Sequence, residues 1–335
     1  MKISGQSKAV EKATDYLNGI VDRNKLLKPI LIYGPSGVGK SHFANAFANE
    51  LGKRDFAIHI IPEPSCIRLV DKAKETLYPM LESGGKKAIF IDEAHLAIAA
   101  TNQQGFSSVV RNALRGLIYP HGQSVQQLVK FAVDSEEILV DFSETLIVLM
   151  TNEPRKLDNC GPNNLGEYPI ERRVFTIKLE KYKEDEIEDV ILDMVKARGL
   201  TISDCALGPI KRFHRGTLQA LSEVLDAFTM KFPDSKNITL AKLTAAARTT
   251  NFYYRGLNIQ EVQLLNRLDE SADGAIYRNH LNMDAKNLNS AVSYLNGQRK
   301  DGKPYPFLIM AGSKLKITKA GRTYLSKLKE DGFRF

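Results

Sequence analysis

The sequence lacks the features of several protein classes. It has only three cysteines, Cys66, Cys160 and Cys205, and no two of them form a Cys-x-x-Cys pair. This scatter argues against a disulfide framework or a zinc site and indicates buried free thiols in a reducing cytosol. No apolar run is long enough to span a bilayer, and the start MKISGQSKAVEK has no apolar signal region. We therefore expect a cytoplasmic protein that does not contact a membrane.

The length and the charge set broad limits on what the chain can be. Its 335 residues, 43% of them hydrophobic, allow two or three globular domains with real cores. The formal net charge is +8 and the isoelectric point is about 9.2. This balance is compatible with a polyanionic partner, but many soluble proteins are mildly basic. The position of the charge along the chain therefore matters more than its sum.

The most informative stretch has the spacing G-x-x-x-x-G-K-[ST]. It consists of Gly34, Pro35, Ser36, Gly37, Val38, Gly39, Lys40 and Ser41. An apolar run at 29–33 precedes it and a helix-compatible run at 41–51 follows, which is the strand–loop–helix context that the motif needs. The glycines let the backbone wrap around phosphates, and the helix N-terminus points free N–H groups at the anion. The alternative is a plain Gly-rich turn, but the fixed identities and both flanks favour a nucleoside-triphosphate site. Lys40 would reach the β- and γ-phosphates, and the Ser41 hydroxyl would bind Mg²⁺.

Two acids follow another apolar run. Residues 88–91 predict a buried parallel strand, and Asp92 and Glu93 stand at its carboxyl end, where open α/β sheets bind ligands. Asp92 would hold Mg²⁺ through water, and Glu93 would polarise the water that attacks the γ-phosphate. An acidic helix N-cap is the alternative reading. The position of the pair, roughly fifty residues after the phosphate loop, favours the catalytic role.

Five further residues are weaker candidates for the nucleotide site. A turn at Gly5 and Gln6 predicts either an adenine contact or simply the start of a helix. Asn152 follows a buried strand at 145–150 and would bond the γ-phosphate or the attacking water, although Asn also begins many turns. Arg172 and Arg173 follow a loop rich in Pro, Gly and Asn, and either is a candidate arginine finger for a neighbouring subunit's nucleotide. Two solvated arginines are the alternative.

The remaining chain divides into three segments. Helices are expected near 65–81 and 106–118, and residues 128–142 predict an inserted β-hairpin that either packs on its own domain or touches DNA or a partner. From Lys183 a helical lid is expected, with Arg212 and Arg215 near its helix starts, from where such a lid would bring a cation back to the nucleotide. Residues 256–335 predict a winged helix, with helices at 258–268 and 284–295, a short helix at 276–281, and strands at 306–311 and 314–318.

This last segment is basic. It has thirteen lysines and arginines against eight acids, a net charge of about +5. A solvated basic face is the alternative, but cations around a hairpin favour contact with a DNA backbone. The candidate DNA-binding residues are Lys286 on the expected recognition helix and Arg299, Lys300, Lys303, Lys314, Lys316, Lys319 and Arg322 around the wing.

These parts together resemble an AAA+ ATPase, and more closely the RuvB family, the motors that drive branch migration of Holliday junctions. The shared order is a Gly-Gln near the start, LIYGPSGVGKS, FIDEAH, an inserted hairpin, a Thr-Asn pair, an Arg-Gly-Thr at 215–217 and a winged helix. The phosphate loop and the FIDEAH stretch are common to all AAA+ proteins. The inserted hairpin and the winged helix narrow the resemblance to the RuvB family.

The resemblance implies an α/β fold with a P-loop core, a parallel sheet flanked by helices, followed by an α-helical lid and a winged-helix domain. Its domains would be 1–181, 182–255 and 256–335. ATP and Mg²⁺ would be the cofactors, with Gln6 near adenine and Arg215 at the nucleotide. The subunits would form a hexameric ring on duplex or branched DNA, and the 128–142 hairpin would contact a partner protein.

Two departures from the family pattern bear on function. The family's P-L-R-x-R-F-type stretch reads Pro169-Ile170-Glu171-Arg172-Arg173-Val174 here, so its first arginine is replaced by Glu171. The lid's R-G-T-P-R ends in Gln219, in place of the arginine that senses the γ-phosphate. Two functions stay open: an ATP-driven DNA motor, and an ATP-switched loader or scaffold with slow turnover. A protein remodeller is a third reading, but we find no aromatic–Gly pore loop.

Overall fold

The computed structural model describes most of the chain. The described residues are 3–21, 28–61, 85–95, 128–133, 136–141, 144–155, 157, 174–183, 186–214, 217–250, 252–281, 283–300 and 303–333. Contacts divide the chain into two compact units, Met1–Tyr182 and Lys183–Phe335, and each is described by itself. The division of the second unit at 255 stays a prediction. No described helix is long and apolar enough to cross a membrane.

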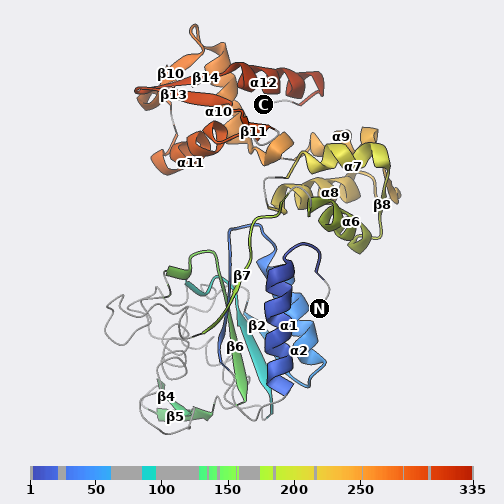
Figure 1. The fold of residues 1–335 in the computed structure, drawn as a ribbon, viewed down its shortest axis with the longest axis vertical. Helices are drawn as coiled ribbons and strands as arrows, with labels where there is room; N and C mark the ends of the chain where they lie inside the picture. Colours follow the sequence, from blue (N-terminus) through green and yellow to red (C-terminus); the bar gives the residue numbers. More distant parts are fainter. Residues whose placement is uncertain are drawn as a thin grey trace. The chain divides into compact units, whose positions relative to one another are not determined.

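The first unit is built on a parallel sheet of five strands in the order β2-β3-β6-β1-β7 (Figure 1). The strands are β1 (Ile30–Tyr33), β2 (Ala57–Ile61), β3 (Lys87–Ile91), β6 (Thr145–Thr151) and β7 (Phe175–Lys178). Strands β3 and β6 are buried along their whole length, as expected for continuous apolar runs covered on both faces. Because all the pairs are parallel, the carboxyl ends of the strands meet at one edge of the sheet.

Two helices cover one face of this sheet (Figure 1). Helix α1 (Ser7–Val21) buries Ala9, Ala13 and Leu17, which recur at four-residue steps. Helix α2 (Lys40–Gly52) follows the phosphate loop and buries Phe43 and Phe47 in the same core. The helix packing therefore holds the phosphate loop against the carboxyl ends of the strands.

A two-stranded hairpin lies between β3 and β6 in the chain. Strands β4 (Leu128–Val133) and β5 (Glu136–Asp141) pair antiparallel, with Phe131 opposite Ile138. The side chains of this hairpin are not described, so its contact with a partner stays a prediction. The helices expected near 65–81 and 106–118 lie outside the described residues, as do Cys66 and Cys160.

The second unit begins with the helical lid. Its helices are α6 (Ile187–Ala197), α7 (Asp204–Lys211), α8 (Gln219–Lys231) and α9 (Leu240–Ala247), and two short parallel strands join them, β8 (Thr201–Ile202) and β9 (Asn237–Ile238). Cys205 is free but exposed, so the expectation of a buried thiol was wrong there, because Cys205 stands in the first turn of α7 on its solvent side. Arg212 was expected near a helix start, but it is the C-cap residue that directly follows α7.

The rest of the second unit is the winged helix. It contains η4 (Tyr254–Gly256), α10 (Ile259–Glu270), β10 (Ala275–Tyr277), η5 (Arg278–His280), α11 (Ala285–Asn296), β11 (Arg299–Lys300), β12 (Lys303–Pro304), β13 (Leu308–Ala311), β14 (Lys314–Ile317) and α12 (Lys319–Glu330). The wing is a sheet in the order β10-β14-β13. The short helix expected at 276–281 is confirmed only over η5, because Ile276 pairs with Leu315 across the sheet and makes the first residues of that range part of β10. The predicted fold class is confirmed.

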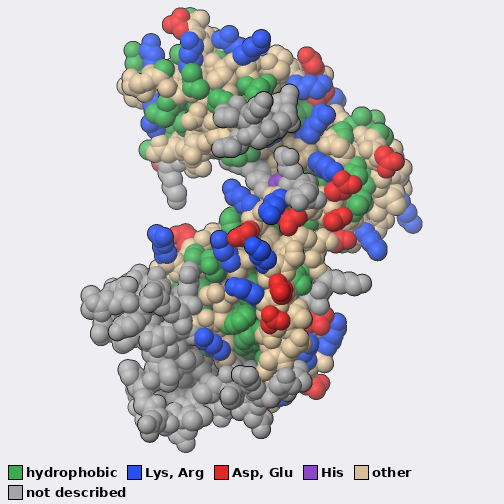
Figure 2. All heavy atoms as spheres, viewed as in Figure 1, with side chains coloured by type: hydrophobic (Ala, Val, Ile, Leu, Met, Phe, Trp, Pro, Cys, Tyr) green, Lys and Arg blue, Asp and Glu red, His purple; other side chains and the backbone are tan. Residues whose placement is uncertain are grey.

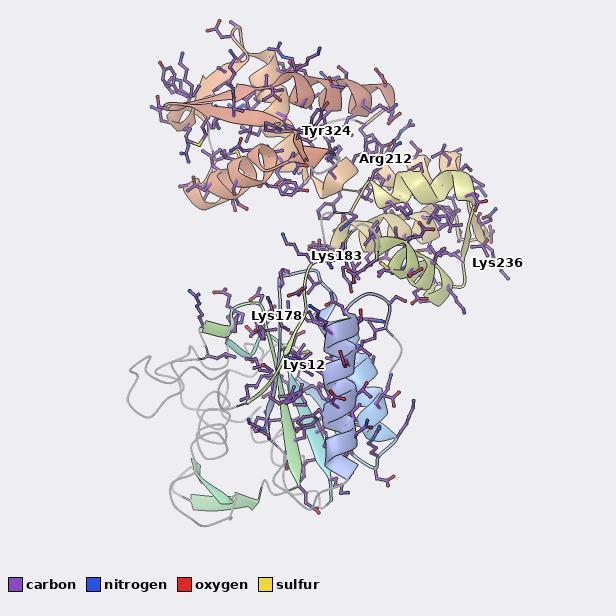
Figure 3. The ribbon with its side chains drawn as sticks, viewed as in Figure 1. Lys12, Lys178, Lys183, Arg212, Lys236 and Tyr324 are labelled. Carbon is purple, nitrogen blue, oxygen red and sulfur yellow. The ribbon has the colours of Figure 1, made fainter. Side chains whose placement is uncertain are left out.

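Charged side chains of both signs lie on the visible face of each unit (Figure 2). Figure 3 places Arg212 at the end of α7 and Tyr324 in α12 within the second unit, and Lys178 on β7 in the first. The site that these elements build in the first unit comes from the carboxyl ends of β1, β3 and β6.

Candidate nucleotide-binding and hydrolytic site

The phosphate loop has the backbone that its glycines permit. Gly37 and Gly39 take φ angles of 75° and 88°, a region that side chains disfavour. Gly34 is required for another reason, because a Cβ there would lie 2.5 Å from the carbonyl oxygen of Leu179. The segment after β7 therefore presses directly on the first residue of the loop.

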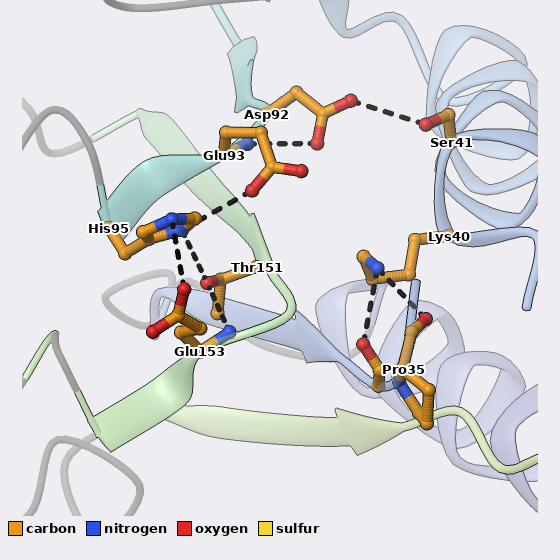
Figure 4. Close-up of polar contacts among 9 residues, drawn as sticks. Pro35, Lys40, Ser41, Asp92, Glu93, His95, Thr151 and Glu153 are labelled. Atoms are coloured by element: carbon orange, nitrogen blue, oxygen red, sulfur yellow. Dashed lines mark hydrogen bonds and ion pairs between the residues drawn. The ribbon is translucent and has the colours of Figure 1, made fainter. Parts of the chain in front are cut away.

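Lys40 is buried at the bottom of the loop, with 8% of the residue exposed. Its Nζ donates to the carbonyl oxygens of Gly34 and Pro35, both at 3.1 Å (Figure 4). Burial lowers the pKa of the ammonium, and the carboxylates of Glu93 and Asp92 act in the opposite direction. A phosphate group placed here would supply the anionic partner that a buried ammonium needs.

Ser41 and Asp92 offer oxygen atoms to a cation from two different elements. The Ser41 hydroxyl donates to Asp92 Oδ2 at 3.2 Å, and Asp92 Oδ1 accepts from the backbone N–H of Glu93 at 2.9 Å (Figure 4). Among the described residues, no group of three or more His, Cys, Asp or Glu side chains could hold a metal on its own. Few protein oxygens, completed by water and phosphate, are the ligands that Mg²⁺ prefers, so the residues present fit this ion.

Glu93 stands at a strained position beside these groups. Its φ is 45°, which is uncommon for a residue with a side chain and is found at functional sites. Its Oε2 is buried without a hydrogen-bond donor among the described residues and lies 3.3 Å from His95 Nδ1. The carboxylate thus lies next to the phosphate loop, and its Oε2 accepts no hydrogen bond among the described residues.

A second group of polar side chains fixes His95, which is 5% exposed. Its Nδ1 lies 2.9 Å from the hydroxyl of Thr151, and that hydroxyl also accepts from the backbone N–H of Glu153 at 2.9 Å (Figure 4). The other ring nitrogen, Nε2, lies 3.9 Å from the carboxylate of Glu153. The last residue of β6 therefore orients the histidine that adjoins Glu93.

Sequence reasoning missed His95, Thr151 and Glu153. It selected Asn152 instead, which is exposed next to the network, and its contact with the γ-phosphate stays a prediction. The available signal was a hydroxyl at the end of a buried strand, with a histidine two residues after Glu93. The sequence alone does not show that these two residues lie side by side, because that follows from the register of β3 and β6.

We expect Thr151→Val to lower the turnover number for ATP about tenfold, with ATP affinity and thermal stability little changed. Valine keeps the shape of the buried side chain but removes the hydroxyl that holds His95 by a hydrogen bond, so the histidine beside Glu93 is no longer fixed in place. Steady-state kinetics and thermal melting measure the two effects. Thr145→Val is the matched control, because the Thr145 hydroxyl is also buried on β6 but has no hydrogen bond among the described residues. Equal losses from both variants would contradict the assigned role.

The start of the chain is clamped to the end of β7. The amide of Gln6 donates to the carbonyl of Glu180 at 2.6 Å and accepts from its N–H at 3.0 Å. Gly5 and Gln6 both have positive φ, 66° and 75°. Tyr182, which sequence reasoning missed, donates its hydroxyl to the carbonyl of Val38 in the phosphate loop at 3.1 Å. The adenine contact of Gln6 stays a prediction. In the structure its side chain bonds the backbone of Glu180.

Several predicted residues are not placed by the structure. Arg172, Arg173 and Arg215 lie outside the described residues, and the side chains of Lys286, Arg299, Lys300 and Lys303 are not described. Their roles stay predictions.

Comparison with known proteins points to one class. Residues 30–163 match the family described as ATPase family associated with various cellular activities (AAA). The chain is 24% identical over 272 residues to the Holliday junction branch migration complex subunit RuvB of Fusobacterium nucleatum, an alignment that covers 81% of this chain and 74% of that protein. It is 25% identical to the RuvB subunit of Chloroflexus aurantiacus over 66% of this chain and 56% of the relative.

A solved structure gives the same fold. The Thermotoga maritima RuvB Holliday junction branch migration motor has a TM-score of 0.55 at 16% identity, with 99% of this chain and 96% of that one covered. The parallel sheet, the phosphate loop and the match over residues 30–163 indicate an AAA ATPase domain and support an ATP hydrolase. Within that class the chain resembles the RuvB proteins at low identity and shares their fold.

Proposed function

We propose that this protein is an oligomeric motor that hydrolyses ATP to translocate or remodel duplex or branched DNA. The observation that carries the proposal is the wing, which presents lysines on one face of a sheet in the same chain as the ATPase site. Lys314 lies opposite Tyr277 and Ala311, and Lys316 lies opposite Ala275 and Ile309. Because side chains alternate along a strand, these two lysines share a face.

The wing lysines are suited to a phosphate backbone. Lys316 is exposed, and Lys314 Nζ lies 4.6 Å from the centre of the Tyr277 ring, which holds the ammonium at the surface. Arg322 pairs with Asp269 at 3.1 Å, so its charge is partly neutralised. Lys319 lies outside the sheet, as the first residue of α12. We therefore assign the main electrostatic contact to Lys314 and Lys316.

Hydrolysis would use the groups of the first unit. Lys40 and the loop N–H groups would hold the triphosphate, and Ser41 and Asp92 would hold Mg²⁺, which when bound neutralises developing phosphate charge. Glu93 would orient the attacking water. In a hexameric ring, Arg172 or Arg173 of one subunit would reach the nucleotide of the next.

One observation favours a second function, an ATP-switched loader or scaffold with slow turnover. Gln219, at the position where the RuvB pattern has a sensing arginine, begins α8 and is uncharged. A lid without that cation would couple weakly to the γ-phosphate, and ATP would then control assembly more than movement.

We expect duplex DNA or a four-way junction to raise ATP turnover severalfold, and the double change Lys314→Glu and Lys316→Glu to abolish this rise while leaving turnover without DNA intact. Two reversed charges should also make the fall of log affinity with log salt less steep, by about two or more units of slope. Steady-state turnover and salt-dependent binding measure both effects, with Lys236→Glu, an exposed lysine of the lid, as the matched control.

The outcomes separate the two functions. Stimulation followed by displacement of a block on DNA supports the motor. Slow turnover that DNA leaves unchanged, with ATP-dependent assembly on DNA, supports the loader or scaffold. No binding to any DNA would contradict both.

A further inference from the structure

The neutral ring of His95 carries its proton on one of two nitrogens, and the groups around the ring decide which one. Three side chains surround it, those of Thr151, Glu93 and Glu153 (Figure 4). His95 and Thr151 are both buried, so bulk water hardly competes with these contacts. The position of the proton therefore follows from the hydrogen bonds and charges that the fold places here.

The hydroxyl of Thr151 needs an acceptor for its own proton. Its oxygen already accepts a hydrogen bond from the backbone N–H of Glu153 at 2.9 Å. Among the described residues, the only other hydrogen-bond partner of this hydroxyl is Nδ1 of His95, also at 2.9 Å. A buried hydroxyl whose proton has no acceptor is costly, so Thr151 donates to Nδ1. A nitrogen that accepts this bond carries a lone pair and no hydrogen.

Glu153 favours the same tautomer from the other side of the ring. Its carboxylate lies 3.9 Å from Nε2. An N–H at Nε2 presents positive partial charge to this carboxylate, whereas a bare Nε2 would present a lone pair to it. Because the Glu153 side chain is 46% exposed, solvent screens this preference, and the buried hydroxyl of Thr151 sets the larger part of it. Both neighbours thus place the proton of His95 on Nε2.

Glu93 lies beside the nitrogen that has no proton in this tautomer. Its Oε2 is 3.3 Å from Nδ1, yet it makes no hydrogen bond among the described residues. The opposite tautomer would carry an Nδ1–H next to this oxygen and would offer it a hydrogen bond. Such a bond stabilises the charged form of a carboxylate and makes it a weaker proton acceptor. The tautomer of His95 therefore decides whether Glu93 stays unbonded.

We propose that Thr151 and Glu153 hold His95 in its neutral Nε2–H form, and that this form keeps Oε2 of Glu93 free for the attacking water. His95 is then a positioning residue, because it acts through Glu93. The role goes beyond packing, since a ring in the same place with its proton on Nδ1 would hold the carboxylate of Glu93 back. This inference rests on the hydrolytic role proposed for Glu93.

The tautomer can be read directly by ¹⁵N NMR of the histidine side chains in the full chain without nucleotide. At about pH 8, above the ordinary titration range of histidine, a ring nitrogen with a proton and one without have well separated shifts. The chain has six histidines, so the signals of His95 are those that His95→Gln removes. We expect the proton on Nε2 in the unmodified chain and in Thr151→Ser, and a rise of the Nδ1–H form in Thr151→Val. Thr145→Val, whose buried hydroxyl on β6 has no hydrogen bond among the described residues, should leave the His95 signals unchanged.

Steady-state kinetics tests whether the tautomer matters for hydrolysis. Thr151→Ser keeps the hydroxyl and should hold ATP turnover within about twofold of the unmodified chain, whereas Thr151→Val should lose about tenfold. The KM for ATP should change little in either variant, because the phosphate loop is intact. Rescue by serine and the ¹⁵N shifts together separate a hydroxyl that sets the tautomer from one that only fills space.

Two results would overturn the inference. A proton on Nδ1 of His95 in the unmodified chain would do so whatever the turnover, and so would equal losses of turnover in Thr151→Ser and Thr151→Val. If the spectra are as expected but Glu93→Gln hydrolyses ATP at the unmodified rate, the proposed role of Glu93 fails, and the link from His95 to hydrolysis fails with it. None of these measurements uses DNA, so a failure of the DNA function would be seen separately.

Discussion

Lys40→Ala should remove ATP binding and ATP turnover together. The ammonium is buried between two carbonyl oxygens at the bottom of the phosphate loop, and no other described lysine donates to these carbonyls. Charge-assisted hydrogen bonds to phosphate contribute about 1.5–3 kcal/mol each, so the loss of two lowers affinity by roughly 10²–10⁴-fold. Calorimetric titration with ATP and steady-state turnover measure both quantities.

The control for this variant is Lys53→Ala. Lys53 follows the same helix, α2, but its side chain is 68% exposed and pairs with Glu50 on the surface. Surface pairs of this kind contribute about 0–1 kcal/mol, so ATP binding should be unchanged. Lys40→Ala also leaves two carbonyls with one donor fewer, so a thermal melt separates lost binding from lost folding. Turnover at the unmodified rate would show that the phosphate loop is misassigned.

The parts of the site that the sequence predicted are local in the chain. The phosphate loop requires consecutive residues at fixed spacing between a strand and a helix, and Asp92 and Glu93 follow their own apolar strand directly. Lys40, Ser41, Asp92 and Glu93 therefore lie together in the structure as their patterns indicate. The sheet order could be expected only as part of the family resemblance, because apolar strands do not specify their neighbours.

The parts that sequence reasoning missed depend on contacts between distant segments. Thr151 reaches His95 only because β3 and β6 pair in one register, and Tyr182 reaches Val38 across 144 residues. The helix expected at 276–281 began too early, over Ile276 and Tyr277, because the pairing of β10 with β14 lies about forty residues further along the chain.

Glu93→Gln should abolish turnover while ATP binding remains. Glutamine has nearly the same shape, so the strained backbone at φ 45° and the neighbouring Asp92 contact can persist. It is uncharged and cannot polarise the attacking water, and general-base catalysis contributes roughly 10²–10⁴-fold. The carboxylate is already free to act, because its Oε2 accepts no hydrogen bond among the described residues and only adjoins His95.

The measurement is single-turnover hydrolysis beside equilibrium binding of ATP, with Glu153→Gln as the matched control. Glu153 lies on the far side of His95, 3.9 Å from Nε2, and its side chain is 46% exposed. Its loss should lower turnover by no more than about tenfold, because it acts through the histidine and not on the water. If Glu93→Gln turns over ATP as fast as Glu153→Gln, the base is another residue. If it fails to bind ATP, Glu93 has a structural role at the loop, and the separation of binding by Lys40 from chemistry by Glu93 is wrong.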